Sequence, residues 1–339
     1  MSTQAELQTT IEEMVQKGKG ILAADESNPT IAKRFKPIGV ESTEETRRDW
    51  RSLLISTPGL GDYISGVILF EETLGQKADD GTPLPQLAGA QGIVPGIKVD
   101  KGTIPLVNAP GDLITQGLDG LAERLKGYKE QGARFAKWRE VYPIGKHNPK
   151  HLGVEANAEV LARYAAICQS VGIVPIVEPE VLIDGDHSIE RCFEVIEKVH
   201  LAVYAALYRY RVNLEYTILK PSMVTPGKDF GHKASPIEVA ENTIRVLRRS
   251  VPAAVPSINF LSGGQTDDEA TANLNAMNQV YTNLPWEVSF SYGRALQQAA
   301  LHAWQGKREK RQATQDALLK RARLNGAARY GTYTPEMET

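Results

Sequence analysis

One apolar run that ends in acidic residues sets the pattern of the whole chain: Ile173-Val174-Pro175-Ile176-Val177-Glu178-Pro179-Glu180. Similar runs recur after helix-like segments at intervals of roughly 30 to 45 residues, which is the rhythm of consecutive βα units. The eight runs are Ile21–Asp25, Val67–Phe70, Gly96–Val99, Phe135–Arg139, Ile173–Glu178, Tyr216–Lys220, Ile258–Leu261 and Glu287–Ser291. This number of units predicts a sheet that closes on itself.

Helix start signals lie between these runs. Ser235-Pro236-Ile237-Glu238 and Thr266-Asp267-Asp268-Glu269 each place a hydroxyl three residues before a carboxylate, which is the pattern of a capping box. Residues 189–208 repeat apolar side chains at three-, four- and seven-residue steps, as in a helix packed on a sheet. The predicted fold class is therefore α/β: a single (β/α)8 TIM barrel with additional N- and C-terminal helices.

The chain length fits one such barrel. Its 339 residues are many for one compact core but ordinary for a barrel with extra helices, and no low-complexity linker divides them. We expect a single domain over residues 1–339, with the barrel at about 18–305 and a helical tail at 306–339. The tail is rich in Arg and Lys, but interleaved acidic and apolar residues favour a solvated helix over a nucleic acid patch.

Composition limits the kind of partner. The chain is 42% apolar and 24% charged, and its net charge of -2 gives no basic excess for nucleic acid or an anionic membrane. Its first residues lack the layout of a secretory signal, and no run of about 18 apolar residues occurs. Small molecules are the expected partners, the expected location is cytoplasmic, and Cys168 and Cys192 are expected to be reduced structural thiols.

Ionisable residues gather at the predicted strand ends, where the catalytic groups of a barrel lie. Strand side chains alternate between faces, so Lys137 and Arg139 are expected on one face and Trp138 on the other. Each residue taken alone is explained equally well by a structural ion pair, but ion pairs have no reason to cluster at the same strand ends. The residues concerned are Asp25, Lys98, Lys137, Arg139, Glu178, Glu180 and Lys220.

A lysine ends the sixth run, in Thr217-Ile218-Leu219-Lys220-Pro221. Such a lysine is a candidate amine nucleophile when desolvation or a neighbouring cation favours its neutral form. Lys137 is the expected source of that neighbouring charge. A buried salt bridge remains the alternative explanation for Lys220 alone.

Two glycine-containing turns indicate phosphate binding. Ser262-Gly263-Gly264 leads toward the predicted cap at Thr266, and Gly293-Arg294 precedes another helix. Glycines let backbone N–H groups approach an anion, and helix N-termini add favourable partial charge. A lone Gly-Gly usually means a turn, but Arg34, Lys98 and Arg294 supply further cationic donors.

The sequence does not predict a metal site. The histidines are scattered, and Pro149 separates the closest pair, His147 and His151. The segment Asp184-Gly185-Asp186-His187 lacks the remaining ligands of a calcium loop, so it is interpreted as a surface turn.

Taken together, these segments closely resemble class I fructose-1,6-bisphosphate aldolases over nearly the whole span from Gly18 to Pro335. The resemblance implies that Lys220 forms a Schiff base with the substrate and that Glu178 is the general acid/base. It also implies that Asp25, Lys137 and Glu180 complete the catalytic set. The segments that carry the resemblance are residues 20–27, 66–70, 96–102, 135–139, 173–180, 219–221, 260–265 and 290–294.

The resemblance also implies a substrate and an assembly. Fructose 1,6-bisphosphate would be cleaved reversibly to dihydroxyacetone phosphate and glyceraldehyde 3-phosphate, in glycolysis and gluconeogenesis, without a metal or other cofactor and in a homotetramer. Thr30 stands where vertebrate members have serine, and neither Tyr330 nor Tyr333 occupies the terminal tyrosine position of those members. The implied substrate-binding residues are Arg34, Lys98, Arg139, Ser262, Gly263, Gly264, Ser291, Gly293 and Arg294.

Two alternatives stay open on the sequence alone. One is another Schiff-base barrel of the transaldolase or deoxyribose-phosphate aldolase kind, which shares the lysine but not this set of segments. The other is a non-catalytic barrel that binds sugar phosphates, because a barrel does not dictate activity.

Overall fold

The computed structural model describes residues 2–339, and its eight main strands run parallel and close into a barrel in the order β1-β10-β9-β8-β7-β6-β3-β2. Each of the eight predicted runs contributes one strand, so the predicted fold class is confirmed. The bounds are β1 (Gly20–Ala24), β2 (Ile64–Leu69), β3 (Val94–Lys98), β6 (Phe135–Tyr142), β7 (Val174–Val181), β8 (Ile218–Leu219), β9 (Ser257–Phe260) and β10 (Glu287–Tyr292).

Strand β8 is shorter than the sequence predicts. Tyr216 lies in a 3-10 turn before the strand instead of opening it, and Pro221 has no N–H with which to extend the hydrogen-bonding ladder. Lys220 therefore follows the strand, although its backbone N–H still donates to the carbonyl oxygen of Val177 at 2.8 Å. That bond fixes Lys220 to the neighbouring strand β7.

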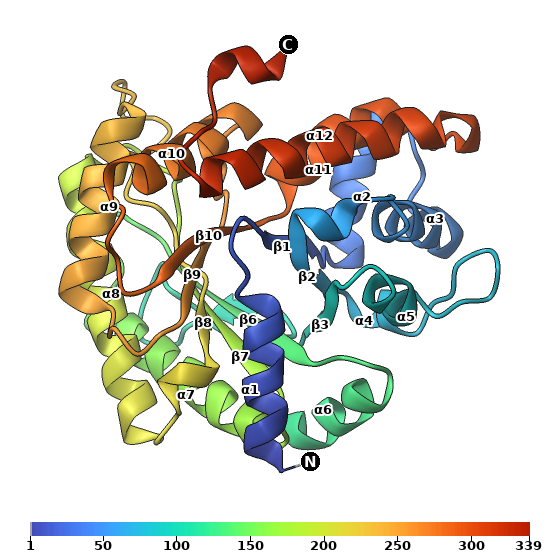
Figure 1. Cartoon of the computed structure of the whole chain (residues 1–339). Coiled ribbons are helices and arrows are strands. Elements are labelled where there is room, and N and C mark those ends of the chain that lie inside the picture. Colours follow the sequence, from blue (N-terminus) through green and yellow to red (C-terminus); the bar gives the residue numbers. More distant parts are fainter. Residues whose placement is uncertain (1) are drawn as a thin grey trace.

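Helices surround the barrel, as Figure 1 shows. The capping box predicted at Thr266 is present, whereas at Ser235 only the serine hydroxyl accepts a backbone N–H. The bounds are α1 (Thr3–Met14), α2 (Asn28–Phe35), α3 (Glu44–Ile55), α4 (Glu71–Leu74), α5 (Leu84–Gly89), α6 (Leu121–Glu130), α7 (His151–Ser170), α8 (Ile189–Arg209), α9 (Pro236–Ser250), α10 (Asp267–Val280), α11 (Arg294–Trp304) and α12 (Arg311–Arg329).

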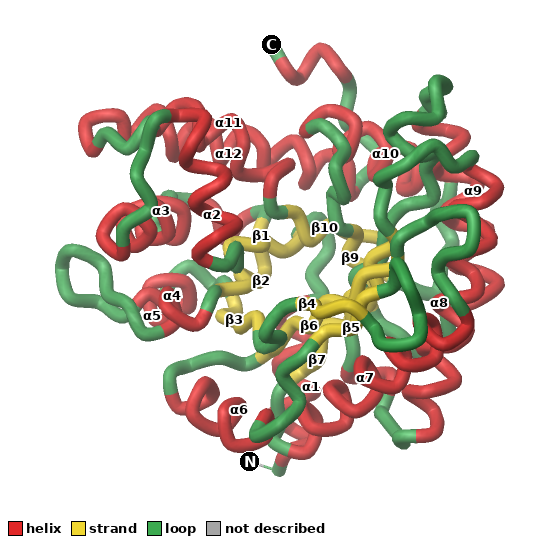
Figure 2. Tube along the Cα trace, turned by 180° about the vertical axis from the view of Figure 1, so that it is seen from behind, coloured by secondary structure: helices red, strands yellow, loops and turns green. Residues whose placement is uncertain are grey.

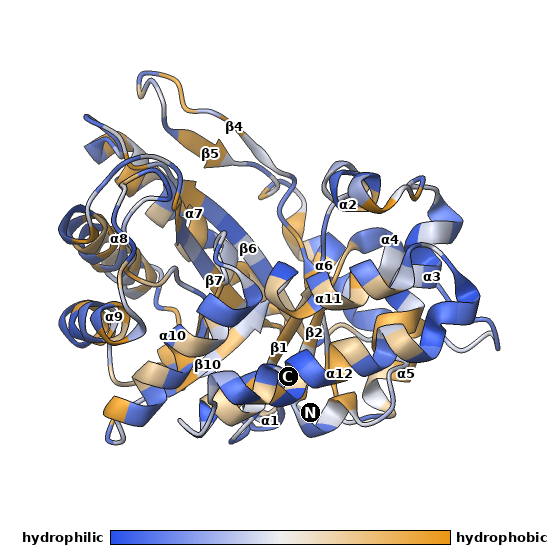
Figure 3. Cartoon of the chain, turned by 90° about the horizontal axis from the view of Figure 1, so that it is seen from above, coloured by the Kyte–Doolittle hydropathy of each residue, from blue (hydrophilic) through white to orange (hydrophobic). Residues whose placement is uncertain are grey.

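The helical stripe predicted in residues 189–208 faces the barrel. Ile189, Phe193, Ile196, Val203 and Leu207 of α8 are all buried. Figure 3 shows hydrophilic and hydrophobic residues side by side on α8 and α9, as expected of helices that cover a sheet on one side and meet solvent on the other.

Helix α1 closes the amino end of the barrel. Its Leu7, Ile11 and Met14 join an apolar cluster with Phe135 and Val174, which begin strands β6 and β7. Figure 1 is seen from this end, with α1 in front of the strands. The amino end is therefore filled by side chains.

The carboxyl ends of the strands lie on the opposite side of the barrel, which faces the viewer in Figure 2. An antiparallel hairpin of β4 (Thr103–Pro105) and β5 (Leu113–Thr115) lies at this end. This hairpin is not among the elements predicted from the sequence. The carboxyl end is the open mouth of the barrel.

Phe135 fills the lower interior because its neighbours are glycines. A Cβ atom on Gly96 would lie 2.3 Å from the Phe135 ring, and one on Gly66 would lie 3.3 Å from it. Both glycines sit on the neighbouring strands β3 and β2. The small residues thus make room for one large ring, as close packing of an interior requires.

The C-terminal helix α12 is not the solvated helix that the sequence predicts, because ten of its 19 residues are buried, mainly against α10 and α11. Arg329 donates to the carbonyl oxygen of Lys19 at 3.0 Å and pairs with Glu287 at 2.8 Å. Arg321 pairs with Glu338 at 2.6 Å. The basic residues of the tail therefore attach it to the barrel.

The two cysteines are buried free thiols on α7 and α8, as predicted. Burial raises the pKa of Cys192 to about 12, which keeps this thiol protonated and unreactive.

None of the helices in residues 2–339 combines the length and the apolar character needed to cross a membrane.

Candidate active site

Four buried ionisable side chains meet inside the barrel, above the apolar layer around Phe135. The Lys137 Nζ atom lies 2.8 Å from Oδ2 of Asp25 and 3.1 Å from Oε2 of Glu178. The Lys220 Nζ atom lies 3.1 Å from Oε1 of Glu178. Asp25 and Lys220 directly follow β1 and β8, whereas Lys137 and Glu178 lie within β6 and β7, and Glu178 lies between the two amines.

The opposite charges of this cluster stabilise the ionised forms of Asp25 and Lys137. Burial on its own raises the pKa of Asp25, but Lys137, Lys220 and Lys98 more than offset it and hold that pKa well below its usual range. Burial lowers the pKa of Lys137, but the anions Asp25, Glu178 and Asp100 raise it well above its usual range. Asp25 is therefore an anion and Lys137 a cation at neutral pH.

The carboxylate of Glu178 lies between Lys137, the expected neighbouring cation, and Lys220, and it contacts both amines. Lys137 is thus placed to hold Glu178 and Asp25, while Glu178 is the group that can exchange a proton with Lys220.

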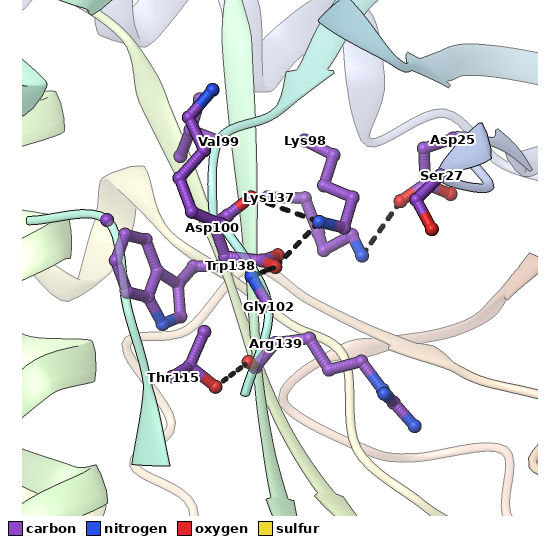
Figure 4. A network of polar contacts seen from close by, with 12 residues as sticks. Asp25, Ser27, Lys98, Val99, Asp100, Gly102, Thr115, Lys137, Trp138 and Arg139 are labelled. Carbon is purple, nitrogen blue, oxygen red and sulfur yellow. Dashed lines mark hydrogen bonds and ion pairs between the residues drawn. The ribbon is translucent and has the colours of Figure 1, made fainter. Parts of the chain in front are cut away.

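Glu180 lies on the same face of β7 as Glu178, as predicted, but it pairs with Arg139 of β6. Burial lowers the pKa of Arg139, and Glu180 more than offsets this and raises it above its usual range. Figure 4 shows Trp138 on the other side of the strand from Arg139. The predicted alternation along β6 is correct, and the Arg139–Glu180 pair lies one step nearer the mouth than Lys137 and Glu178.

Lys98 is held at the end of β3. Its Nζ atom donates to Oδ1 of Asp100 at 2.6 Å and to the backbone carbonyl oxygen of Asp100 at 3.0 Å, and Oδ1 also accepts the N–H of Gly102 at 3.2 Å. Figure 4 shows the Lys98 and Lys137 side chains close together. Lys98 therefore adds a cation to the charged part of the site.

Two loops at the mouth have the geometry of an anion site. Gly263 and Gly264 follow β9 with φ of 49° and 90°, a conformation that favours glycine. A Cβ atom on Gly264 would lie 3.8 Å from Nη2 of Arg294, so the glycine loop and the start of α11 adjoin. The hydroxyl of Ser291 is buried and has no hydrogen-bond partner within residues 2–339. Ser262 and Gly293 flank these groups at the ends of β9 and β10.

Arg34 lies on α2, with its Nε atom 3.4 Å from Oε1 of Glu26. Glu26 is not among the residues predicted from the sequence, although it directly follows Asp25 after the first strand, which is a usable signal. Ser27 is not among them either; it precedes α2, and its hydroxyl lies 3.1 Å from that of Thr30. Polar groups therefore line the loop between β1 and α2.

A cavity of about 880 Å3 adjoins the mouth at Gly264. It lies between the loop after β8, the first turns of α10 and the C-terminal residues Tyr333, Pro335 and Glu338. Lys220 does not line this cavity. The cavity therefore lies beside the cluster of Asp25, Lys137, Glu178 and Lys220 and does not enclose it.

The described part of the chain contains no group of three or more His, Cys, Asp and Glu side chains arranged to hold a metal ion. His147, His151 and the segment 184–187 thus give no such cluster within residues 2–339.

The chain is similar to known proteins over nearly its whole length. Residues 6–339 match the family model described as fructose-bisphosphate aldolase class I. The chain is 56% identical to the cytosolic fructose-bisphosphate aldolase 6 of Arabidopsis thaliana, over 93% of this chain and 88% of that protein. It is 56% identical to the fructose-bisphosphate aldolase of Drosophila melanogaster, over 97% of this chain and 92% of that one.

A solved structure is also similar over almost its full length. It is a fructose-bisphosphate aldolase from Plasmodium falciparum in a ternary complex with TRAP and a small-molecule inhibitor. The TM-score is 0.96 at 51% sequence identity, covering 98% of this chain and 96% of that one.

Proposed function

Because this chain belongs to the class I fructose-bisphosphate aldolase family, we propose that Lys220 is the amine that forms the Schiff base and Glu178 the group that moves its protons. The chain itself is an enzyme that cleaves fructose 1,6-bisphosphate reversibly to dihydroxyacetone phosphate and glyceraldehyde 3-phosphate. Neither the transaldolase alternative nor the non-catalytic alternative is favoured, since the relatives are named fructose-bisphosphate aldolases at 54–56% identity.

One observation carries the residue assignment: the Glu178 carboxylate lies 3.1 Å from Lys220 through one oxygen and 3.1 Å from Lys137 through the other. An amine needs a free electron pair to attack a ketone, so Lys220 must first lose a proton, and Glu178 is within reach to accept it. The charged Lys137 keeps the carboxylate in place between the two amines.

Formation of the covalent intermediate then follows in two steps. The Lys220 nitrogen adds to C2 of fructose 1,6-bisphosphate to give a carbinolamine. Glu178 returns a proton to the C2 oxygen, water leaves, and a protonated C2 imine, the iminium, remains on Lys220. The iminium carries a positive charge next to C3.

Cleavage uses that charge as an electron sink. Glu178 removes the proton of the C4 hydroxyl, the C3–C4 bond breaks, and its electron pair moves into the iminium to form an enamine. C4 becomes the aldehyde carbon of glyceraldehyde 3-phosphate. Asp25, held as an anion by Lys137, is placed to orient the hydroxyls at the reacting carbons.

The remaining steps release the second product. The enamine is protonated at C3, water adds to the iminium carbon, and loss of dihydroxyacetone phosphate restores the Lys220 amine. We propose that this route is metal-independent, with the iminium supplying the electron sink that a metal-polarised carbonyl group supplies in other chemistry. Activity retained in excess chelator supports this, and activity lost in chelator and restored by a divalent metal contradicts it.

We propose that the phosphate groups bind at the mouth, where they supply remote binding energy and orientation. Backbone N–H groups of the glycine loop, the unpaired Ser291 hydroxyl and the start of α11 favour an anion. Arg139 and Glu180 then line the path between the phosphates and Glu178. The proposed phosphate contacts are Arg34, Lys98, Ser262, Gly263, Gly264, Ser291, Gly293 and Arg294.

Borohydride trapping tests the assignment of Lys220. Dihydroxyacetone phosphate is incubated with the enzyme, the imine is reduced, and the modified residue is located by mass spectrometry. Lys220→Met is expected to abolish the adduct. Lys101→Met is the matched control, because Lys101 is an exposed lysine near the mouth that pairs with Glu71. An undiminished adduct in Lys220→Met refutes the assignment.

We also propose a cytoplasmic homotetramer whose barrel, about residues 18–305, and tail, 306–339, unfold together as one domain. A cytosolic relative and the family resemblance support the first part, and the buried pairs of Arg321 and Arg329 support the second. Light scattering after size-exclusion chromatography should give the mass of four 37.2 kDa chains. Two separate calorimetric transitions would contradict a single domain.

A further inference from the structure

A buried polar cluster lies behind the loop after β1 and outside the reacting groups. Its centre is Glu26, whose side chain is 6% exposed. Oε2 of Glu26 accepts a hydrogen bond from Nη2 of Arg51 at 3.1 Å, and Oε1 accepts one from Nε2 of Gln297 at 3.0 Å. Arg34 lies against the same carboxylate, with Nε 3.4 Å from Oε1. None of the steps above uses this carboxylate.

The partners of Glu26 are themselves fixed. Arg51 of α3 is 1% exposed and also donates to Oγ1 of Thr73 at 2.9 Å and to the carbonyl oxygen of Glu26 at 3.0 Å. Gln297 of α11 donates to the carbonyl oxygen of Ala23 at 2.7 Å and accepts from Nε1 of Trp50 at 3.1 Å. The cluster therefore joins β1, α3 and α11 through buried hydrogen bonds, although Nε of Arg51 has no partner within residues 2–339.

The cluster reaches both arginines proposed to bind phosphate. The Nε atom of Arg34 is buried beside Glu26, and the side chain as a whole is 25% exposed, so only its terminal nitrogens can meet an anion from solvent. Arg294 begins α11, and Gln297 lies one helical turn after it. The Glu26 carboxylate thus contacts one arginine directly and holds the helix that carries the other.

We infer that Glu26, held by Arg51 and Gln297, is a positioning residue that fixes Arg34 relative to Arg294 and thereby favours sugars with two phosphates over sugars with one. The inference rests on the proposed function, because it takes the phosphate contacts from there. A ligand with two phosphates gains from two cations kept at a constant separation, since neither has to be ordered on binding. A ligand with one phosphate gains much less.

Binding of unreactive analogues tests this inference without the chemistry of Lys220. Glucitol 1,6-bisphosphate and glucitol 6-phosphate have no carbonyl group, and calorimetry gives the Kd of each. In Glu26→Gln and in Gln297→Met we expect the Kd of the bisphosphate to rise about tenfold, as when one charge-assisted contact is lost, and that of the monophosphate to change less than about twofold. Arg51→Lys keeps the charge but loses the forked geometry and should give a smaller rise, of about threefold.

A matched control separates positioning from general destabilisation. Arg47 lies one turn before Arg51 on α3 and pairs with Glu72 at 2.6 Å, without contacting Glu26. Arg47→Lys should leave the ratio of the two Kd values unchanged. If Arg51→Lys does not fold, the milder Gln297→Met still gives a result.

The outcomes separate this inference from the proposed function. If the wild-type enzyme gives no dihydroxyacetone phosphate adduct on Lys220, the proposed function fails. If wild type and variants all give that adduct but the ratio of the two Kd values is the same in each, the positioning role of Glu26 is overturned and the proposed function stands.

Discussion

The lower and upper layers of the barrel interior are built on the same strands and yet have opposite chemistry. In the lower layer Phe135, Ile176 and Ile218 pack with α1 in an apolar cluster. Two residues further along the same strands, Lys137, Glu178 and Lys220 form the charged cluster. One step of strand alternation therefore separates the residues that stabilise the barrel from those proposed to react. Four substitutions test how complete that separation is.

The largest expected effect is on activity in the upper layer. Lys220→Met should lower kcat/KM for fructose 1,6-bisphosphate by about 10,000-fold or more, which is a loss of about 5 kcal/mol of transition-state stabilisation. The variant should remain folded, because Glu178 keeps Lys137 as a partner at 3.1 Å. A coupled assay and circular dichroism measure the two quantities. Residual activity close to wild type contradicts the assignment.

The next effect is on stability in the lower layer. Phe135→Ala should reduce the free energy of unfolding by about 3–5 kcal/mol, because the ring is fully buried between glycines that cannot refill the space. Denaturant unfolding measures this loss. Below its melting temperature the variant should still form the dihydroxyacetone phosphate adduct. Loss of the adduct in the folded variant would show that the two layers are coupled.

Per pH unit, a smaller change in stability concerns a carboxylate on the outer face of the same strand. Burial raises the pKa of Glu140 from 4.5 to about 8, so the folded state keeps a proton that the unfolded state releases within this range. Stability should therefore fall as pH rises from about 4.5 to 8, by up to about 1.4 kcal/mol per pH unit. Glu140→Gln should flatten this slope in melting temperatures measured from pH 5.5 to 8. Equal slopes in both proteins would rule out a protonated Glu140.

The smallest effect lies outside both layers. Thr266→Ala removes the hydroxyl that accepts the N–H of Glu269 at the start of α10, and this should cost about 1 kcal/mol of stability. Thr266→Ser keeps the hydroxyl and is the control. Neither variant should change the yield of the borohydride-reduced adduct, because the cap does not contact Lys220.

The sequence predicted the strands and the alternation of residues along them well because both depend on local pattern, but β6 and β7 extend past the predicted ends at Arg139 and Glu178. The alternation of Lys137, Trp138 and Arg139 requires only that residues 135–139 form a strand, and β6 provides it. Strand β8 was predicted too long, since the conformation of Tyr216 depends on the chain around it and not on its own apolar character.

The partners of those residues could not be predicted in the same way. That Glu178 contacts both Lys137 and Lys220 depends on the register of β7 between β6 and β8, which no single run encodes. Arg51 and Gln297 lie on helices far from Glu26 in sequence, and only the closed barrel brings them together. Their polar character alone is typical of any helix surface.

The position of helix α1 determines how substrate, products and water reach Lys220. Because Leu7, Ile11 and Met14 close the amino end of the barrel, the substrate, the products and water all reach and leave Lys220 through the carboxyl end. Fructose 1,6-bisphosphate enters, glyceraldehyde 3-phosphate leaves and the water for hydrolysis enters by this same route. Release of glyceraldehyde 3-phosphate therefore gives water access to the intermediate that yields dihydroxyacetone phosphate. A compound that binds at the carboxyl end of the barrel after cleavage should lengthen the lifetime of the covalent intermediate on Lys220.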